Sequence, residues 1–438
     1  MFAPTPRLTG RRALIGSFAV FVCLGWSIPS FAQPNKDEKK NSQSNSTNGH
    51  RELVTPGPVH TLGECIRIAS EKSPLLAAKR ASLESAQAGQ AGIDKASRIM
   101  HSLIAPDLKY RKQQASAGVA AAEAELMQTE YDVTYNVIRN YYTAVYAREQ
   151  FRVTYDLVTQ LNSYLDFVKD AIKEGGLRGI DIRTQDRLQM YVGQGAMRKA
   201  EAENGYRRAL RALAHEMGVG PDYLFDVADR TLPEVKAENI TREVVIGHAV
   251  SRRGEITLAC VGAEVLRLEV DAQGVIRCRL RSFTAAAGSD VHSHIVPQGS
   301  REGEYRPDAI PPEYPALLVG PRSNRVARAE ALSMRAEAVY EKTRDLVTLE
   351  AENGFYRWEE SSQKVVALKD AATGGRDLRD RNRKDGNGKF TDEKLIADEA
   401  LIARTLADYN EALYSQLVNL AALERITAGG IRVNFPGR

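Results

Sequence analysis

The sequence has few of the residues from which catalytic and metal sites are usually built. Its 438 residues include only 4 Cys and 7 His, and they contain no Ser-His-Asp signature, no phosphate-binding glycine loop and no CxxC pair. Three cysteines, Cys65, Cys260 and Cys278, would remain after loss of an N-terminal leader, and an odd set of this kind is not a disulfide framework. We therefore expect a protein that is not an enzyme and holds no cofactor.

A large excess of charge of one sign is also missing. The formal net charge is +4, and Arg7, Arg11 and Arg12 supply three of these charges within the leader itself. Because the rest of the chain is close to neutral, there is no electrostatic case for binding nucleic acid.

The first 32 residues predict a signal peptide. They have its three parts: a basic start with Arg7, Arg11 and Arg12, an apolar segment over residues 13–26, and small residues at Ser30 and Ala32 before the cleavage point. The apolar segment is too short to be a convincing membrane span. The Arg11-Arg12 pair leaves twin-arginine export open as an alternative to the general route, and Cys23 leaves a lipid anchor open.

Residues 33–57 contain almost no apolar side chains. Such a segment cannot bury enough surface to offset the entropy lost on ordering, so we expect a disordered linker. Thr61 and Glu64 then form the pattern of a capping box at the start of a short helix, and Pro74 suits the first turn of the next helix.

A very long helix is predicted over residues 117–174. Apolar residues recur at steps of three and four along it, interrupted only at Thr129 and Arg148: Val119, Ala122, Leu126, Val133, Val137, Tyr141, Ala144, Phe151, Tyr155, Val158, Leu161, Leu165, Val168 and Ile172. Gly175-Gly176 ends the helix, and Asp181 caps a second long helix that reaches Met217. The two helices are expected to form an antiparallel hairpin with coiled-coil-like packing.

The second half of the chain repeats this plan. Thr241 corresponds to Thr61, and a Cys65–Cys260 bridge stays open because the two residues occupy matching places. Long helices are predicted over residues 328–368 and from 392 or 393 to 427, with the turn between them at Gly374-Gly375 and residues 376–389. The domains expected are a first helical-hairpin repeat, 58–235, and a second, 236–438, with an irregular or strand-prone insert at 275–321. Such a repeat indicates duplication of one helical unit.

Three stretches of sequence carry a resemblance to a known family. They are TLGECIRIASEKSPLLAAKRASLESAQAG (61–89), GVAAAEAELMQTEYDVTYNVIRNYYTAVYAREQ (118–150) and LADYNEALYSQLVNLAALERITAGG (406–430). In order, length and repetition they resemble the TolC-type outer membrane efflux proteins, over nearly all of residues 60–430. The fold class this implies is mainly α: two tandem long antiparallel α-hairpins of the trimeric α-barrel type.

The resemblance also implies partners and a docking site. The family forms homotrimers in the outer membrane that span the periplasm and work with a periplasmic adaptor protein and an inner-membrane transporter. Its adaptor-docking end is the turn of each hairpin, which corresponds here to Gly176, Leu177, Arg178 and Asp181, and in the second half to Gly375 and Asp377. Plain turn and capping chemistry is an alternative reading of all six residues.

The sequence departs from the family in its strands. Residues 102–114 are too short for a pair of membrane strands, which need about 9–11 residues each. Strand candidates occur only in the second half, at residues 276–294 and 313–320. A non-conducting periplasmic coiled-coil scaffold therefore stays open beside the efflux duct.

Three smaller patterns have plain structural alternatives. His292 and His294 would share one face of a strand, as a metal pair can, but a site needs three or four ligands. Residues 380–388 resemble a calcium loop without its ligand spacing. The cluster of Tyr141, Tyr142 and Tyr146 could line a duct, although tyrosines at helical spacing more often pack against a neighbouring helix.

Overall fold

The computed structural model of the chain describes residues 53–99, 105–174, 180–236, 240–276, 320–385 and 394–438. All of them belong to one compact unit, which covers residues 50–438. The predicted signal peptide, most of the predicted linker and nearly all of the strand-prone insert, including both strand candidates beyond Ile276, lie outside the described residues. The predicted domain boundaries stay predictions.

The described helices fall into two runs of four, whose lengths match in order. The first run has 11, 26, 66 and 35 residues: α1 (Leu62–Lys72), α2 (Pro74–Ile99), α3 (Leu108–Lys173) and α4 (Ile182–Glu216). The second has 11, 22, 64 and 33: α5 (Arg242–Arg252), α6 (Gly254–Val275), α7 (Arg322–Asp385) and α8 (Lys394–Ile426). The mainly α fold class with two tandem long hairpins is confirmed.

The helix starts follow from their capping residues. The Thr61 hydroxyl accepts from the Glu64 backbone N–H while the Glu64 carboxylate accepts from the Thr61 N–H, at 3.3 and 2.9 Å, so the predicted capping box is present. Thr241 caps α5 in the same way by accepting from the Val244 N–H. Pro74 stands at the first position of α2, where its missing N–H costs nothing.

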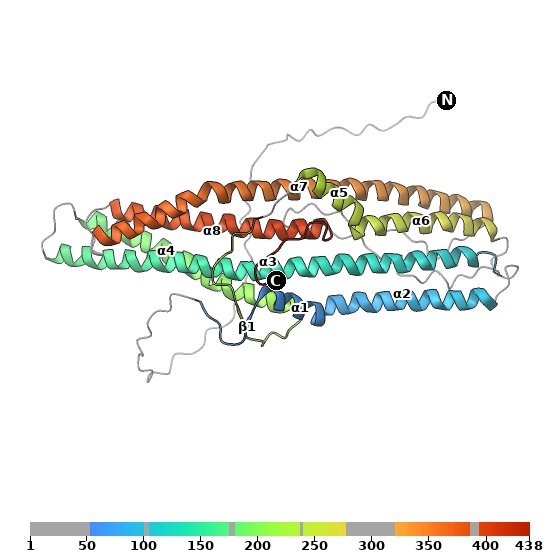
Figure 1. Cartoon of the computed structure of the whole chain (residues 1–438), viewed down its shortest axis with the longest axis horizontal. Coiled ribbons are helices and arrows are strands. Elements are labelled where there is room, and N and C mark those ends of the chain that lie inside the picture. Colours follow the sequence, from blue (N-terminus) through green and yellow to red (C-terminus); the bar gives the residue numbers. More distant parts are fainter. Residues whose placement is uncertain (1–52, 100–104, 175–179, 237–239, 277–319, 386–393) are drawn as a thin grey trace, which may run out of the picture. The chain divides into compact units, whose positions relative to one another are not determined.

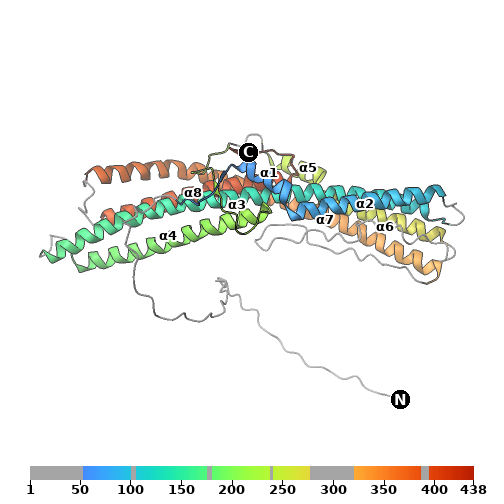
Figure 2. The ribbon, with the colours of Figure 1, turned by 90° about the horizontal axis from the view of Figure 1, so that it is seen from below.

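The two longest helices, α3 and α7, are each flanked by shorter helices along their length (Figures 1 and 2). In one half, α4 packs on α3, α3 on α8, and α8 on α7; in the other, α2 packs on α3, α3 on α6, and α6 on α7. Among the described helices, α4 packs extensively only against α3. The helices therefore form a single layer, with α4 and α7 at its two edges in the first of these halves.

The predicted apolar stripe of α3 forms the centre of this layer. None of its fourteen residues is exposed in the structure, and Val137, Tyr141, Ala144, Leu161 and Val168 are fully buried. Thr129 and Arg148, which interrupt the apolar pattern, are buried as well. The stripe is continuous because these two polar side chains are satisfied within it.

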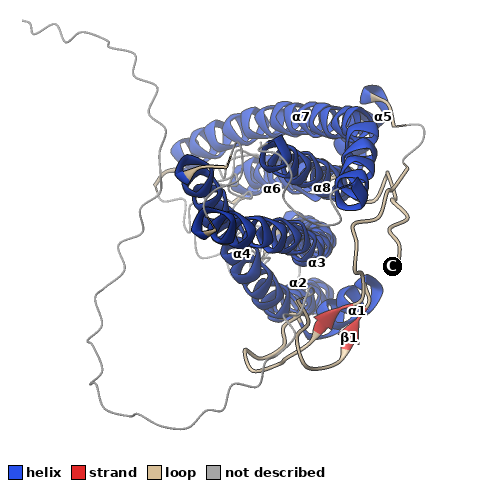
Figure 3. Ribbon diagram, turned by 90° about the vertical axis from the view of Figure 1, so that its left-hand side faces the viewer, coloured by secondary structure: helices blue, strands red, loops and turns tan. Residues whose placement is uncertain are grey.

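Arg148 ties the ends of two loops to α3. It pairs with Asp226 and donates to the carbonyls of Asp229, at 2.7 Å, and of Leu53, at 3.2 Å. Asp226 begins β2 (Asp226–Val227), which pairs in parallel with β1 (Val59–His60). Figure 3 shows the helices roughly end-on, with β1 and α1 beside α2. The last residues of the predicted linker, 53–57, thus lie against the folded unit.

Several sequence predictions are wrong in detail. The first long helix begins at Leu108 rather than at residue 117, and α7 runs from Arg322 to Asp385 rather than from 328 to 368. Cys65 and Cys260 are free thiols, the first buried in α1 and the second exposed on α6, so they form no bridge. Burial raises the pKa of the Cys65 thiol to about 12.

A buried cluster of charges joins three helices of the second run. Arg253, whose side chain is fully buried, binds Glu255 at 2.7 Å and also pairs with Glu350 of α7. The other carboxylate oxygen of Glu350 accepts from Arg425 of α8 at 2.9 Å. Burial by itself would raise the pKa of Glu350, but the guanidinium groups of Arg253 and Arg425 outweigh it and lower that pKa below its ordinary value of 4.5. Glu350 is therefore held ionised in the core.

Replacing Glu350 by Ala should destabilise the protein by about 3–5 kcal/mol, because two buried guanidinium groups would lose their partner. The free energy of unfolding from urea titration measures this. Glu360→Ala, at an exposed position of the same helix, should leave that free energy nearly unchanged. Equal effects of the two substitutions would contradict the role assigned to the cluster.

Acid should unfold the protein through the same residue. Because the pKa of Glu350 is lower in the folded state, the unfolded state binds more protons at acidic pH. The contribution of Glu350 to the free energy of unfolding is therefore complete above about pH 4.5 and is lost as the pH falls further. Urea titrations at several pH values below 5 should show this loss for the wild type. Glu350→Gln should flatten the pH dependence.

Gly254 allows α6 to approach α3 closely. A Cβ at this position would lie 2.5 Å from the carbonyl oxygen of Ala124, whereas one at Gly262 on the same helix would meet nothing within 4 Å. Gly254→Ala should cost about 1–3 kcal/mol through overpacking, and Gly262→Ala should stabilise by about 0.4–1 kcal/mol. Thermal unfolding of both variants tests this, and a stabilising Gly254→Ala would refute the close approach.

Candidate functional site

The described part of the chain offers no cluster for catalysis on a metal. No group of three or more His, Cys, Asp or Glu side chains there could hold a metal ion. His292 and His294 lie outside the described residues. Of the segment that resembles a calcium loop, residues 380–385 belong to the last turns of a helix, and residues 386–388 lie outside the described residues. None of the helices described is both long and apolar enough to cross a membrane. The candidate sites in this part of the chain are therefore surfaces of the helices.

The structure describes the two helix ends that flank the turn of the first hairpin, Lys173 of α3 and Ile182 of α4. Helix α3 ends at Lys173, and Asp181 caps α4, its carboxylate accepting from the Thr184 N–H at 3.0 Å. This backbone hydrogen bond lowers the pKa of Asp181. Capping by Asp181 is confirmed. Three predicted docking residues, Gly176, Leu177 and Arg178, lie outside the described residues, so their docking role stays a prediction.

The turn of the second hairpin was predicted in the wrong place. Gly375 and Asp377 lie inside α7, which continues to Asp385. Gly374-Gly375 does not end the helix because side chains on both sides of the pair anchor it: Ala372 is fully buried in the core, and the Arg379 side chain is also buried. This packing outweighs the cost of glycine in a helix, about 1 kcal/mol each. The predicted docking turn at Gly375 and Asp377 is therefore wrong.

An ionic contact joins three helices near the turn end. Arg379 of α7 lies 3.4 Å from the Glu399 carboxylate of α8 and 4.0 Å from the Asp156 carboxylate of α3. Glu399 has only 1% of its side chain exposed. This contact was not predicted from the sequence, because Arg379 lies in the segment 376–389 that was predicted to be a turn. The one feature of the sequence that indicates burial of Arg379 is its position seven residues, about two helical turns, after the apolar Ala372.

A groove runs between α4 and α8, with α3 as its floor. It has a volume of about 790 Å³ and is lined by Tyr146 from α3, by Tyr191 and Arg198 from α4, and by Arg404 and Asp408 from α8, among others. The Tyr146 ring stacks on Tyr414 with centroids 4.8 Å apart. Oppositely charged side chains thus border an aromatic floor.

Two tyrosines of the predicted cluster lie in the core, and the third lines this groove. Tyr141 and Tyr142 are fully buried and meet edge to face with centroids 5.5 Å apart. Only Tyr146, whose pKa burial raises to about 12, reaches the groove. Helix packing, the more common role, holds for the first two residues.

The two edges of the layer expose apolar side chains. On α4, Met190 and Met197 are 67% and 51% exposed and stand one heptad apart. On α7, Met334, Tyr356 and Val366 are 64%, 53% and 75% exposed. Large apolar side chains in rows along an unpaired helix are typical of surfaces that contact another molecule. These edges are the candidate interaction surfaces.

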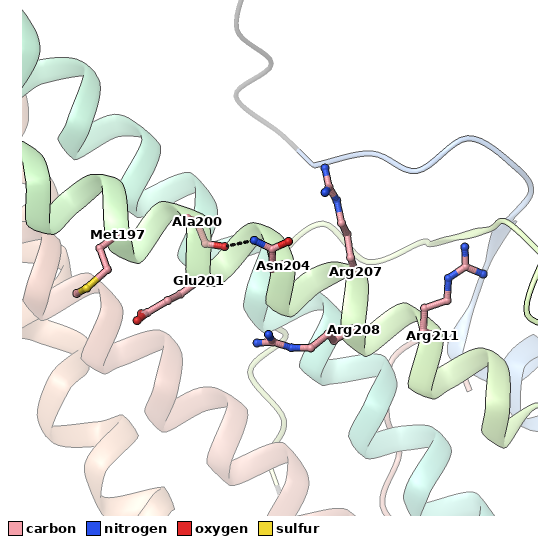
Figure 4. A pocket seen from close by; sticks show the side chains of 7 residues that line it. All are labelled: Met197, Ala200, Glu201, Asn204, Arg207, Arg208 and Arg211. Carbon is pink, nitrogen blue, oxygen red and sulfur yellow. Dashed lines mark hydrogen bonds between the residues drawn. The ribbon is translucent and has the colours of Figure 1, made fainter. Parts of the chain in front are cut away.

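A basic depression lies on the α4 edge. Its lining comes from α4 alone: Met197, Ala200, Glu201, Asn204, Arg207, Arg208 and Arg211 (Figure 4). Arg207 binds Glu203 at 2.7 Å, and Arg211 donates to the carbonyl of Pro221. The three arginines outnumber the two glutamates, Glu201 and Glu203, so this surface carries a net positive charge. This basic surface was not predicted from the sequence, although Arg207 and Arg211 stand one helical turn apart and Arg208 adjoins Arg207.

Comparison with known sequences found no matching family model and no matching curated protein. Comparison with solved structures found several matches. The outer-membrane channel OprN gives a TM-score of 0.64 at 16% identity, covering 84% of this chain and 90% of that one. The open state of the MtrE outer membrane channel of Neisseria gonorrhoeae gives 0.57 at 14%, covering 93% and 98%.

A third match agrees with these two. The outer membrane protein VceC of Vibrio cholerae gives a TM-score of 0.56 at 14% identity, with 85% of this chain and 97% of that chain covered. Nearly the whole length of each channel is therefore matched, at identities that establish the fold. The chain has the fold of the TolC-type outer membrane efflux proteins, the family that its sequence resembles.

Proposed function

We propose that the protein is a component of an outer membrane efflux duct: a passive conduit, not an enzyme, exported by its signal peptide and assembled as a homotrimer. The observation that carries this proposal is the single layer of helices with α4 and α7 at its edges, where α5 covers part of α7 but leaves Met334, Tyr356 and Val366 exposed. A layer of this kind cannot cover its own edge side chains. Copies joined edge to edge would cover them and enclose a lumen.

The matched structures support the same conclusion. OprN and MtrE are described as outer-membrane channels, and this chain matches them over most of its length. A helix the length of α3 reaches about 100 Å at about 1.5 Å per residue. Helices of that length suit a conduit across the periplasm better than a compact binding domain.

The proposed partners are a periplasmic adaptor protein and an inner-membrane transporter. The adaptor would dock at the turn end of the hairpins, and in the first hairpin we assign this role to Gly176, Leu177, Arg178 and Asp181, between α3 and α4. In the second hairpin this role passes from Gly375 and Asp377 to the connection between α7 and α8, residues 386–393. No nucleic acid and no cofactor takes part in this proposal.

Opening would take place at the same end. Splaying of the helices at the turns would widen the lumen, as a rigid-body movement of packed elements. The contact of Arg379 with Glu399 and Asp156 ties α7, α8 and α3 together there. It therefore favours the closed arrangement.

The assembly state provides the first test. The mature protein should stay in the outer-membrane fraction of the cell envelope until detergent is added, and native mass measurement should give three copies. It should also conduct ions in a planar bilayer. A soluble, non-conducting protein after export would overturn the duct and favour the periplasmic coiled-coil scaffold.

The opening mechanism provides the second test of the proposed function. Arg379→Ala should raise the fraction of time that the channel conducts, because the tie between three helices is lost, and should lower stability by about 1–3 kcal/mol. Arg381→Ala, an exposed neighbour on the same helix, is the control for both measurements. Unchanged conductance in the Arg379 variant, with trimers intact, would rule out this tie as a gate.

A further inference from the structure

The groove between α4 and α8 opens on the side of α3 that faces away from the loops of the chain. Tyr141 and Arg148 of α3 bond to the loop residues 226–229. Thr143 and Gln150, which line the groove, each follow one of these two residues by two positions. Since two positions turn a helix by about 200°, the loops and the groove lie on opposite sides of α3.

The loop side of the layer also holds the short elements. Figures 2 and 3 show α1, α5 and the C-terminus on the same side of the long helices, and Figure 3 shows β1 there as well. In the proposed ring these segments would fill the lumen if they pointed inward, so we assign this side to the outside. The groove then lies on the wall of the lumen. This step rests on the proposed function.

The floor of the groove is aromatic. The rings of Tyr146 and Tyr414 stack with centroids 4.8 Å apart and 20° between their planes, and Tyr191 on the α4 wall is 37% exposed. The volume of about 790 Å³ falls within the range of about 300–1,000 Å³ for sites that take drug-sized molecules. Small residues of α4 and α8 leave this space open: Gly195, Ala202, Gly205, Ala400, Ala403 and Ala407.

The α8 wall of the groove is acidic. Asp408 and Glu411 stand three residues apart, on one face of the helix. Burial raises the pKa of Tyr146, and the charges of Glu411 and Asp408 raise it further, so both carboxylates lie near its hydroxyl. Arg404 lies 3.8 Å from Asp408, but the two side chains are 81% and 51% exposed, so this ion pair is weak. Among the residues that the structure describes, no cation pairs with Glu411.

The α4 wall balances its own charges, since Arg198 binds Glu201 at 3.2 Å. Over the whole lining, the two arginines Arg198 and Arg404 face three carboxylates, those of Glu201, Asp408 and Glu411. The groove therefore carries a net negative charge, which lies on the α8 wall beside the aromatic floor.

We infer that this groove is a binding site on the lumen wall for organic cations, molecules that join a substituted ammonium group to an apolar body. The ammonium group lies over the ring of Tyr146, where cation–π attraction and the carboxylates of Asp408 and Glu411 act together. The apolar body lies along the small residues of the two walls. An anion would meet the acidic wall, and a neutral molecule would gain only the apolar contact.

The exposure of the charged side chains sets the strength of binding. Ion pairs and cation–π contacts at exposed sites are individually weak, and the groove is open along its length between two helices. A cation is therefore held briefly and released. Such a site concentrates cations at the wall without stopping their passage, which suits a conduit.

Ligand titration tests the chemistry of the site. Benzyltrimethylammonium should bind the detergent-purified trimer at least about fivefold more tightly than benzyl alcohol or benzenesulfonate, which share its ring but are neutral or anionic. Saturation-transfer NMR in the same detergent measures the three dissociation constants.

Removing the carboxylates tests the assignment to this groove. Asp408→Asn with Glu411→Gln should weaken binding of the cation about fivefold or more and leave binding of benzyl alcohol unchanged. Glu341→Gln with Asp345→Asn removes the same two charges at exposed positions of α7 outside the groove. This control should leave the dissociation constant of the cation unchanged.

Filling the groove provides a second variant. Ala407→Trp should abolish binding of the cation, because the indole would occupy the space over the floor. Ala397→Trp, at an exposed position of α8 that does not line the groove, should bind as the wild type does. Circular dichroism checks that both remain helical, and the carboxylate variants decide the case if Ala407→Trp does not.

Thiol labelling tests the position on the lumen wall. Gln194 lines the groove, and Ala196, exposed two positions later, lies on the opposite side of α4. With Cys260 and Cys278 replaced by Ser, Gln194→Cys should lose conductance stepwise in a planar bilayer when a thiosulfonate bearing trimethylammonium reacts with it. Benzyltrimethylammonium should slow this reaction. Ala196→Cys should keep its conductance.

The outcomes separate this inference from the proposed function. A preference for the cation that is lost with the two carboxylates supports the inference. A conducting trimer that binds the three probes alike, or that binds the cation equally well without Asp408 and Glu411, overturns the inference and leaves the proposed function standing. Equal loss of conductance at positions 194 and 196 overturns the place on the lumen wall. A monomeric, non-conducting wild type overturns both, since no lumen would exist.

Discussion

The length of the buried stripe on α3 is the constraint on which the structure depends. A helix of 66 residues carries an apolar stripe far longer than a compact core can cover, so other helices must cover it in succession. Helices α2 and α4 do so along one flank, and α6 and α8 along the other. Because different helices cover successive parts of the stripe, the helices form a layer rather than a globule. The second run repeats only part of this arrangement, since α6 and α8 cover one flank of α7 and leave the other flank as an edge of the layer.

In a layer of long, Ala-rich helices, apolar packing alone defines the register of neighbouring helices poorly, and buried charges can define it better. Apolar stripes of small side chains fit almost as well after a shift of one turn. Buried ion pairs do not, because a displaced partner would leave a charge without compensation in the core, which costs several kcal/mol. Arg111 with Glu269 joins α3 to α6, and Arg253 with Glu350 joins the start of α6 to α7. We interpret these pairs as fixing the register.

The sequence predicted what depends on local pattern and missed what depends on packing at a distance. Asp181 and Thr61 were correctly identified as caps, since capping is read from neighbouring residues. Gly375 was placed in a turn because a glycine pair is a local stop signal, whereas burial of Ala372 keeps the helix intact. Arg148 was interpreted as a break in the stripe because its partner, Asp226, is 78 residues away. The edges were missed because exposure on one helix depends on which others cover it.

The difference between the two edges limits what the layer can assemble into. A layer with two alike edges could pair with itself about a two-fold axis and leave nothing exposed. Here the two edges are different helices, α4 and α7, with different exposed side chains, so neither edge is built to pair with its own kind about a two-fold axis. Unlike edges join head to tail, which leaves a free edge at each end of any chain of copies until a ring closes. A ring of many tall helices surrounds a space, and for this reason we propose a conduit rather than a solid scaffold.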